Sequence, residues 1–472
     1  MKRLSQALLL ALIIFSGGCT MAPKYTRPAA TVPVDWPEGP AYAERPASSA
    51  FLSAADLSPQ EFFLDPRLQQ VINLALENNL DLRLAVLNVE KARAFYKIQQ
   101  ADLYPAISAS AHGYKHRTSA DLSSSDAPST SEEYGIDVGI TAWEIDLFGR
   151  VRSEKNQAIE KYLASDAGRR AAQISLVSAV GSAYLALAAA REQLLLAQST
   201  LESQEEFYGI IEKQYQNGLA TKLDLRRAQT TVNLAQRDVA QYQQWGAQGE
   251  NALNLLVGSP VPAELLPERL SKVSLPRDFQ MGLSSSVLLS RPDIMAAEHQ
   301  LKAANAYIGV ARAAFFPRIS LTSLIGTASK GISGLFDSGS ETWTLNPMIG
   351  IPLFDARAFL ALQFTHTDQE IALTQYQKAI QTAFKEVADA FAVEGTIDQQ
   401  VAAQESLVEA TEEIYRLAQK RYTGGIESYL SVLDAQRSLY GSQQGLVGLR
   451  LAKLTNQVQL YAVLGGGNGA GR

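Results

Sequence analysis

ADLYPAIS at residues 101–108 and AAFFPRIS at residues 313–320 share an alanine, an aromatic residue followed by proline, and an Ile-Ser pair, 212 positions apart. Further along, the LF pair at 147–148 recurs at 353–354, with an offset of 206. A fixed period of this kind is the mark of an internal repeat. We therefore predict that the chain contains two copies of one supersecondary unit.

The two copies and their flanks follow one another without a large low-complexity region. In chain order the predicted segments are a signal peptide (1–18), a lipid-anchored extended segment (19–61), repeat 1 (62–258, with a β-hairpin at 106–145 and a long helical hairpin at 150–257), a linker (259–283), repeat 2 (284–464, with a β-hairpin at 318–352 and a long helical hairpin at 356–464) and a flexible tail (465–472). The prolines and the glycine of the linker favour a connection between repeats.

Each repeat begins with a predicted helix that changes into a β-hairpin. In repeat 1 this helix covers about 66–102, and Pro105 ends it because the residue before a proline avoids the helical region. Pro317 is the equivalent in repeat 2, so both prolines are predicted helix–strand junctions. The following strands alternate apolar and small or polar residues, and about ten residues per strand suits a tilted crossing of a bilayer.

Very long helices follow each hairpin. No proline occurs between about Arg150 and Tyr215, and apolar residues recur every seven positions from Val180 to Tyr215. A sustained seven-residue period indicates coiled-coil packing. Some 66 residues would give a helix of about 100 Å. We expect tight reversals at NGLAT (217–221) and GGIES (424–428).

The N-terminus is typical of an exported protein. Lys2 and Arg3 precede an apolar run and then SGGC at 16–19. Cys19 is the single cysteine, and its position resembles the lipobox of bacterial lipoproteins, in which that cysteine carries lipid. The alternative is a chance cysteine beside an ordinary cleavage site.

Composition excludes several classes of function. The net charge of −6 argues against a nucleic-acid surface. Nothing in the sequence groups a nucleophile with a base and an acid, or clusters metal ligands, so we predict no enzyme, no metal and no cofactor other than covalent lipid. After the signal peptide we expect no stretch apolar and long enough for a membrane helix.

Four strands per chain cannot close a membrane barrel, because open sheet edges in lipid leave backbone groups unpaired at several kcal/mol each. Small closed barrels start near eight strands. We therefore expect several chains to share one barrel, with the long helices forming a shared cylinder. The alternative is a set of soluble hairpins that cap a periplasmic coiled coil.

Six motifs carry a resemblance to a family. They are ALENNLDLR (75–83), TAWEIDLFGR (141–150), SRPDI (290–294), ARAAFFPRISL (311–321), KAIQTAFKEVADA (378–390) and RYTGGIESYLSVLDAQRSLY (421–440). Nearly the whole chain resembles the outer-membrane efflux channels of the TolC family, most closely the lipoprotein branch typified by OprM. The resemblance implies a mainly α fold with a small β part, and a homotrimer that forms an α-barrel and a twelve-stranded transmembrane β-barrel.

The resemblance also implies partners and sites. The partners are a periplasmic membrane-fusion adaptor, an inner-membrane proton-driven (RND-type) pump and outer-membrane lipid. The residues that match the periplasmic gate of such channels are Asp224, Arg421, Tyr422, Leu430 and Asp434, and those that match the adaptor-contact tips are Gly218, Leu219, Ala220, Thr221, Gly424, Gly425 and Ile426. Solvated surface charge is the simpler interpretation of the two aspartates, and chain reversal alone requires glycine at the tips.

The function that follows is a passive exit duct for drugs and small toxic solutes in a tripartite efflux system, located in the outer membrane and extending into the periplasm. Two alternatives stay open at this point. The same duct architecture serves type I protein secretion, and a lipid-anchored periplasmic scaffold would have no pore at all.

Overall fold

The computed structural model describes residues 20–42, 57–124, 126–274 and 284–467. Two compact units make up the chain, and each combines segments from both halves of the sequence. Unit 1 contains the four strands and unit 2 contains both helix reversals. The segments of unit 1 are Met1–Ala29, Asn88–Ser165 and Ala296–Tyr376, and those of unit 2 are Ala30–Leu87, Asp166–Met295 and Gln377–Arg472.

The order helix, β-hairpin, long helix, reversal and returning helix occurs twice along the described chain. The first set is α4 (Leu80–Ala101), β1 (Ile107–Thr118), β2 (Ser129–Glu144), α5 (Arg150–Gln216) and α6 (Lys222–Val257). The second set is α7 (Pro292–Ala313), β3 (Arg318–Ser329), β4 (Glu341–Gly350), α8 (Ala356–Thr423) and α9 (Tyr429–Val463). Two short helices, α2 (Pro59–Phe62) and α3 (Pro66–Asn78), precede the first set.

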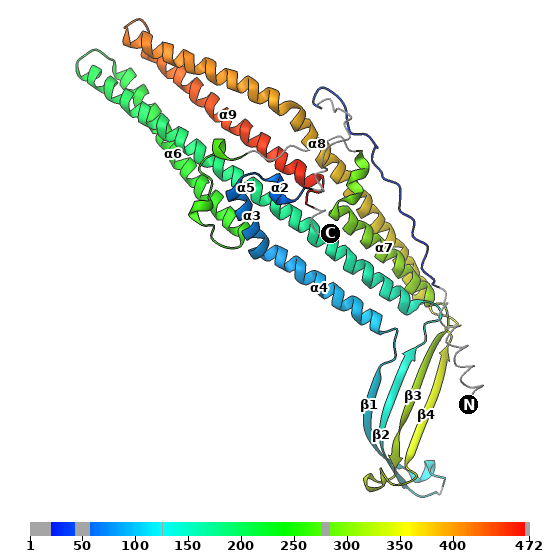
Figure 1. The fold of residues 1–472 in the computed structure, drawn as a ribbon. Coiled ribbons are helices and arrows are strands. Elements are labelled where there is room, and N and C mark those ends of the chain that lie inside the picture. The colour runs from blue at the N-terminus through cyan, green and yellow to red at the C-terminus, as the bar shows by residue number, and fades with distance from the viewer. Residues whose placement is uncertain (1–19, 43–56, 125, 275–283, 468–472) are drawn as a thin grey trace. The chain divides into compact units, whose positions relative to one another are not determined.

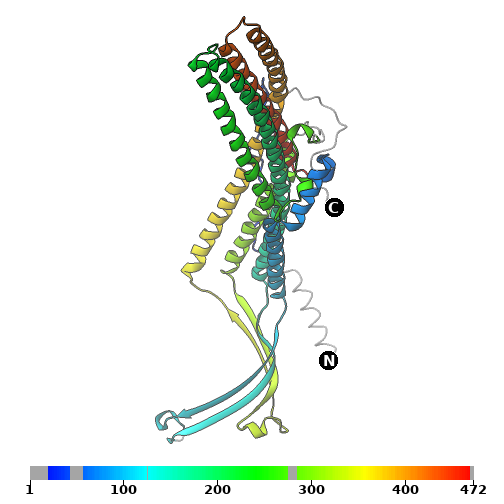
Figure 2. The same cartoon turned by 90° about the vertical axis from the view of Figure 1, so that its left-hand side faces the viewer.

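The strands of unit 1 form one antiparallel sheet in the order β1-β2-β3-β4 (Figure 1). The sheet is twisted and curved in the second view (Figure 2). β2 and β3 pair across the two repeats, with a register shift between Ile140 and Trp143 where Ala142 adopts a φ of 50°. β1 and β4 are therefore the edge strands, and every residue of β4 is exposed.

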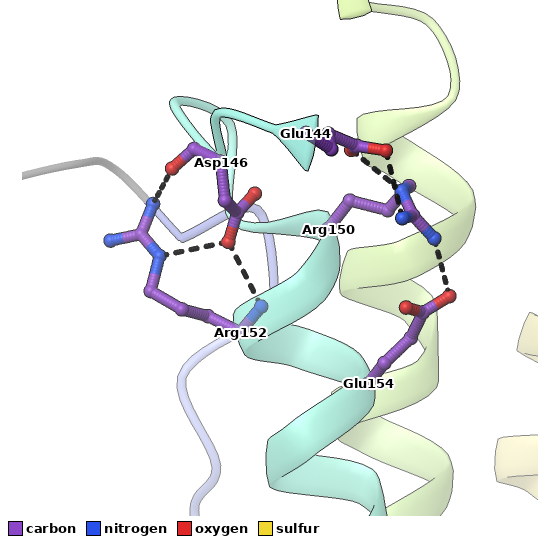
Figure 3. Close-up of polar contacts among 5 residues, drawn as sticks. All are labelled: Glu144, Asp146, Arg150, Arg152 and Glu154. Atoms are coloured by element: carbon purple, nitrogen blue, oxygen red, sulfur yellow. Dashed lines mark hydrogen bonds and ion pairs between the residues drawn. The ribbon is translucent and has the colours of Figure 1, made fainter. Parts of the chain in front are cut away.

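Ion pairs fix the junction between β2 and α5 (Figure 3). The guanidinium of Arg150 donates to both carboxylate oxygens of Glu144 at 2.8 Å and to Glu154 at 2.6 Å. Within the first turn of the helix, Arg152 donates from its backbone N–H and its Nε to Asp146. Bidentate contacts of this kind set orientation as well as energy, so the strand enters α5 in a defined direction.

The core of unit 2 lies between α2, α3, the middle of α5 and the end of α9. Phe62 is fully buried and stacks on Tyr461 with ring centroids 4.2 Å apart. The Tyr461 hydroxyl donates to the Leu57 carbonyl at 3.0 Å, which satisfies its one polar group inside the core. Val180 and Leu187, which share the seven-residue register, belong to the same apolar cluster.

The expectation of one continuous helix over 66–102 is wrong, because Asn79 separates α3 from α4. Its backbone is extended (φ −63°, ψ 125°), and its side-chain oxygen accepts from the Leu82 N–H at 2.8 Å. Its side-chain nitrogen donates to the Leu256 carbonyl at 2.8 Å. Asn79 thus caps α4 and ties the break to the end of α6, which propensity alone does not reveal.

A second correction concerns α5, which is long and apolar enough to cross a membrane by length and composition, with a mean hydropathy of 1.5 over an 18-residue window. The expectation that no such stretch follows the signal peptide is wrong by this criterion. Half of that window is buried inside the structure. A helix in a protein core passes the same test, so the finding is weak evidence for a span.

The chain ends of the described part are held by specific contacts. Arg27 makes a bidentate ion pair with Glu298 on α7, at 3.0 and 2.7 Å. Gly465 and Gly466, which the sequence places in a flexible tail, are buried, and the Gly466 N–H donates to the Tyr461 carbonyl at 2.8 Å. Residues 468–472 of that tail lie outside the described residues.

Candidate functional site

The reversals of the two helical hairpins, α5–α6 and α8–α9, form the candidate site. In both, the last helical turn closes with a Schellman motif, in which a left-handed glycine redirects the chain. Gly218 has a φ of 74°, and the Leu219 N–H donates to the Gln214 carbonyl at 2.8 Å. Gly425 has a φ of 73°, and the Ile426 N–H donates to the Arg421 carbonyl at 2.9 Å. The two tips are therefore built by the same device.

The residue after each of these glycines is large, apolar and exposed. Leu219 is 79% exposed and Ile426 is 70% exposed. In a Schellman motif this residue commonly packs on an apolar side chain one turn back, but that position is held by Gln214 in the first tip and Arg421 in the second. The chain reversals require the glycines. They do not require a large apolar side chain to be exposed to solvent after each glycine.

Asp224 lies in the first turn of α6, where it forms a capping box with Thr221. The Thr221 backbone N–H donates to the Asp224 carboxylate at 3.3 Å, and the Asp224 N–H donates to the Thr221 hydroxyl oxygen at 3.1 Å. A capping box satisfies two backbone donors that the helix leaves free. Asp224 therefore has a local structural role in addition to the gate role implied by its motif.

Arg421 is exposed at the end of α8, and its guanidinium donates to Glu427 in the same reversal at 3.0 Å. The Glu427 carboxylate also accepts from the Ser431 hydroxyl at 2.9 Å. Hydrogen bonds from Ser431 and then Arg421 hold the pKa of the Glu427 carboxyl below its usual range. Glu427 is not among the residues that the sequence singled out.

Tyr422 joins the two hairpins. Its hydroxyl donates to the side chain of Gln214 on α5 at 3.0 Å, and its ring lies 5.7 Å from the ring of Tyr429 on α9. Burial raises the pKa of the Tyr422 and Tyr429 phenols. Together with Phe207, whose ring lies 6.3 Å from that of Tyr429, these aromatics form part of the apolar cluster that holds the tips side by side.

Leu430 and Asp434 stand one turn apart on the first two turns of α9, and both are exposed. The structure thus brings all five predicted gate residues to the ends of the two hairpins. Two of them, Asp224 and Tyr422, hold those ends in place within the chain. Leu430 and Asp434 remain available at the surface of a single chain.

Tyr429 is a further residue of this cluster that was not singled out from the sequence. Tyr415 and Tyr422 follow the seven-residue spacing of α8, but Tyr429 lies beyond the reversal between α8 and α9, where a helical period no longer applies. Tyr429 is buried, and its hydroxyl has no hydrogen-bond partner within the described residues. No sequence pattern singles out Glu427 either.

The remaining predicted site residues are the two helix–strand junctions, three residues of the tips and the lipid-attachment cysteine. Pro105 lies between α4 and β1, and Pro317 lies between α7 and β3. Ala220, Thr221 and Gly424 belong to the reversals described above. Cys19 lies outside the described residues.

Three comparisons with known proteins point to the same family. The family model described as outer membrane efflux protein matches residues 71–259 and 283–466. The antibiotic efflux pump outer membrane protein ArpC and the toluene efflux pump outer membrane protein TtgC, both of Pseudomonas putida, are each 45% identical over 453 residues, covering 96% of this chain and 93% of theirs. The open state of the Neisseria gonorrhoeae MtrE outer membrane channel superposes with a TM-score of 0.83 at 37% identity, covering 95% of this chain and 99% of that one.

Proposed function

Because this chain belongs to the outer membrane efflux protein family, we propose that it is the outer-membrane exit channel of a tripartite efflux system. Three copies would form the channel. Their twelve strands close one transmembrane β-barrel, and their long helical hairpins form one α-barrel that extends into the periplasm. The chain acts as a passive duct and catalyses no reaction, so the driving energy comes from its partners.

The observation that carries this proposal is the pair of open edges on the four-stranded sheet. Among the described residues, β1 and β4 each pair with one strand only, although both have ten or more residues. A lone four-stranded sheet placed in lipid would expose two rows of unpaired N–H and C=O groups, which cost several kcal/mol each. Joining β4 of one copy to β1 of the next removes both edges.

The relatives suggest which solutes pass. They are named for the efflux of antibiotics and of toluene, so we propose that this duct conducts drugs and small aromatic solvents. A duct selects solutes mainly by width and by the charge of its lining. Chemical selection among these solutes would then belong to the inner-membrane pump.

The tips are the proposed contact with a periplasmic membrane-fusion adaptor, which would link the duct to a proton-driven pump of the RND type. Leu219 and Ile426 support this, because two exposed apolar side chains at the ends of helical hairpins are suited to contact another protein. The gate residues would lie just inside, where Leu430 rings exclude water and Asp434 rings disfavour closure. Lipid on Cys19 would hold the N-terminal segment at the outer membrane.

The experiment is deletion of the gene in its host, with complementation by the wild-type chain. We expect deletion to lower the tolerated concentration of several unrelated antibiotics and of toluene, and to leave the set of secreted proteins unchanged. Unchanged tolerance together with loss of a secreted protein would contradict efflux and favour type I secretion.

A further inference from the structure

The two repeats meet inside one chain at the junction between β2 and β3, and this contact is specific. Phe148, just after β2, stacks on Phe316, just before β3, with ring centroids 4.9 Å apart and planes at 22°. Beside it, the Ile145 N–H donates to the Ile319 carbonyl at 2.8 Å. All four residues are half-buried. An aromatic stack and a backbone hydrogen bond thus join repeat 1 to repeat 2 at the end of the sheet where β2 leads into α5.

Each of these four residues has a counterpart in the other repeat, and the described part of the chain gives none of the counterparts an equivalent contact. The 206 offset places Phe148 on Phe354 and Ile145 on Ile351, and the 212 offset places Phe316 on Tyr104 and Ile319 on Ile107. Every one of these counterparts is exposed. Their exposed fractions are 84% for Phe354, 60% for Ile351, 69% for Tyr104 and 74% for Ile107.

We propose that Phe354 of one copy stacks on Tyr104 of the neighbouring copy, which reproduces between chains the Phe148–Phe316 contact seen within one. The Ile351 N–H then donates to the Ile107 carbonyl across the same boundary. This inference rests on the proposed trimeric channel and names the side chains that close it. The occupant is a second copy of this chain, because its own sequence already contains the complementary half of the contact.

The correspondence also sets the register of the strands that meet at the boundary. Within the chain, Glu144 pairs with Ser320 across β2 and β3. The equivalent pair between chains is Gly350 with Ser108. Beyond the register shift, Gly135 pairs with Ala328 within the chain, so the equivalent pair between chains is Glu341 with His116, and both are exposed on their edge strands.

Apolar exposure continues from this junction along the adjoining helices. Within the chain, α5 contacts α7, because Nδ1 of His299 lies 2.6 Å from a carboxylate oxygen of Glu160. The equivalent helices at the boundary are α8 and α4. No residue of α4 is buried, and Ile98 on α4 and Phe364 on α8 are large apolar side chains left exposed. The proposed contact between copies therefore continues from the sheet along α4 and α8.

Cysteine cross-linking of the detergent-purified full chain tests the contact. We expect the double variant Tyr104→Cys/Phe354→Cys, treated with a short bis-maleimide, to run as covalent dimers and trimers on a denaturing gel. Phe148→Cys/Phe316→Cys is the matched control, since its link lies within one chain and leaves a monomer band. Tyr104→Cys/Phe336→Cys is the distance control, because exposed Phe336 follows β3 at the opposite end of the strands. Each single variant reports any link made through Cys19.

The outcomes separate this inference from the proposed function. Monomer bands only from Tyr104→Cys/Phe354→Cys, in a sample whose native mass is that of a trimer, would overturn the aromatic contact and leave the channel standing. Covalent trimers formed equally by Tyr104→Cys/Phe336→Cys would also overturn it. A native mass of one chain would overturn both.

Discussion

Replacing both tip side chains, Leu219→Asp with Ile426→Asp, should abolish drug resistance while trimers still form. The side chains are 79% and 70% exposed, so the substitutions remove little packing, and exposed changes of this kind alter stability by about 0.5 kcal/mol or less. The glycines and the backbone hydrogen bonds of both Schellman motifs are untouched. The fold of the tips is therefore expected to survive.

The two substitutions are expected to weaken binding to the adaptor. Burying one Leu or Ile side chain is worth about 1.5–3 kcal/mol. Losing one such contact would therefore weaken the adaptor complex about 10-fold to 150-fold, and an aspartate left in the contact adds a desolvation cost. Each copy has two tips, so both losses of binding free energy weaken the same complex. Binding of the purified channel to its adaptor, measured alongside drug tolerance in the deletion strain, gives both readouts.

The matched control is Leu122→Asp with Ile332→Asp. These two side chains are 82% and 69% exposed, and they lie in the loops that join β1 to β2 and β3 to β4. The control carries the same change in charge and in apolar area, and it should retain resistance. Full resistance in the tip variant, with normal adaptor affinity, would refute docking through the tips.

Three further changes test other parts of the account. Arg421→Ala frees Glu427 from its 3.0 Å ion pair and, like Asp434→Ala, should raise single-channel conductance in planar bilayers; unchanged conductance in both would remove these residues from the gate. Thr221→Ala removes the capping box of α6 and should destabilise that helix start by about 1 kcal/mol, seen as faster hydrogen exchange in its first turn; unaltered exchange would count against the cap. Phe62→Ala empties a fully buried, stacked position and should cost about 3–5 kcal/mol of unfolding free energy, measured by guanidinium titration; a loss below 1 kcal/mol would mean that the core collapses around the gap.

Much of the fold could be predicted because its strongest signals are local. Glycine at a left-handed position ends a helix whatever surrounds it, so NGLAT and GGIES predict reversals directly, and Gly218 and Gly425 have φ values of 74° and 73°. Proline at 105 and 317 separates helix from strand for the same local reason. The family match and the four-stranded antiparallel sheet confirm the predicted class of protein and its mainly α fold with a small β part.

What escaped prediction depends on contacts between distant segments. The break at Asn79 exists because that side chain reaches Leu256, 177 positions away, and no local pattern records this. The partner of Arg421 is Glu427, six positions on and inside the reversal, because the turn folds the chain back on itself. The structure shows that Asp224 caps the start of α6. Its assignment to the gate stays a proposal.

One chain cannot close its own sheet, so we infer that it shares a barrel with other copies. The native mass of the full chain in detergent tests this, measured on the same preparation that is inserted into planar bilayers. We expect the mass of three chains and a steady conductance. A single intact chain with no pore activity would contradict it.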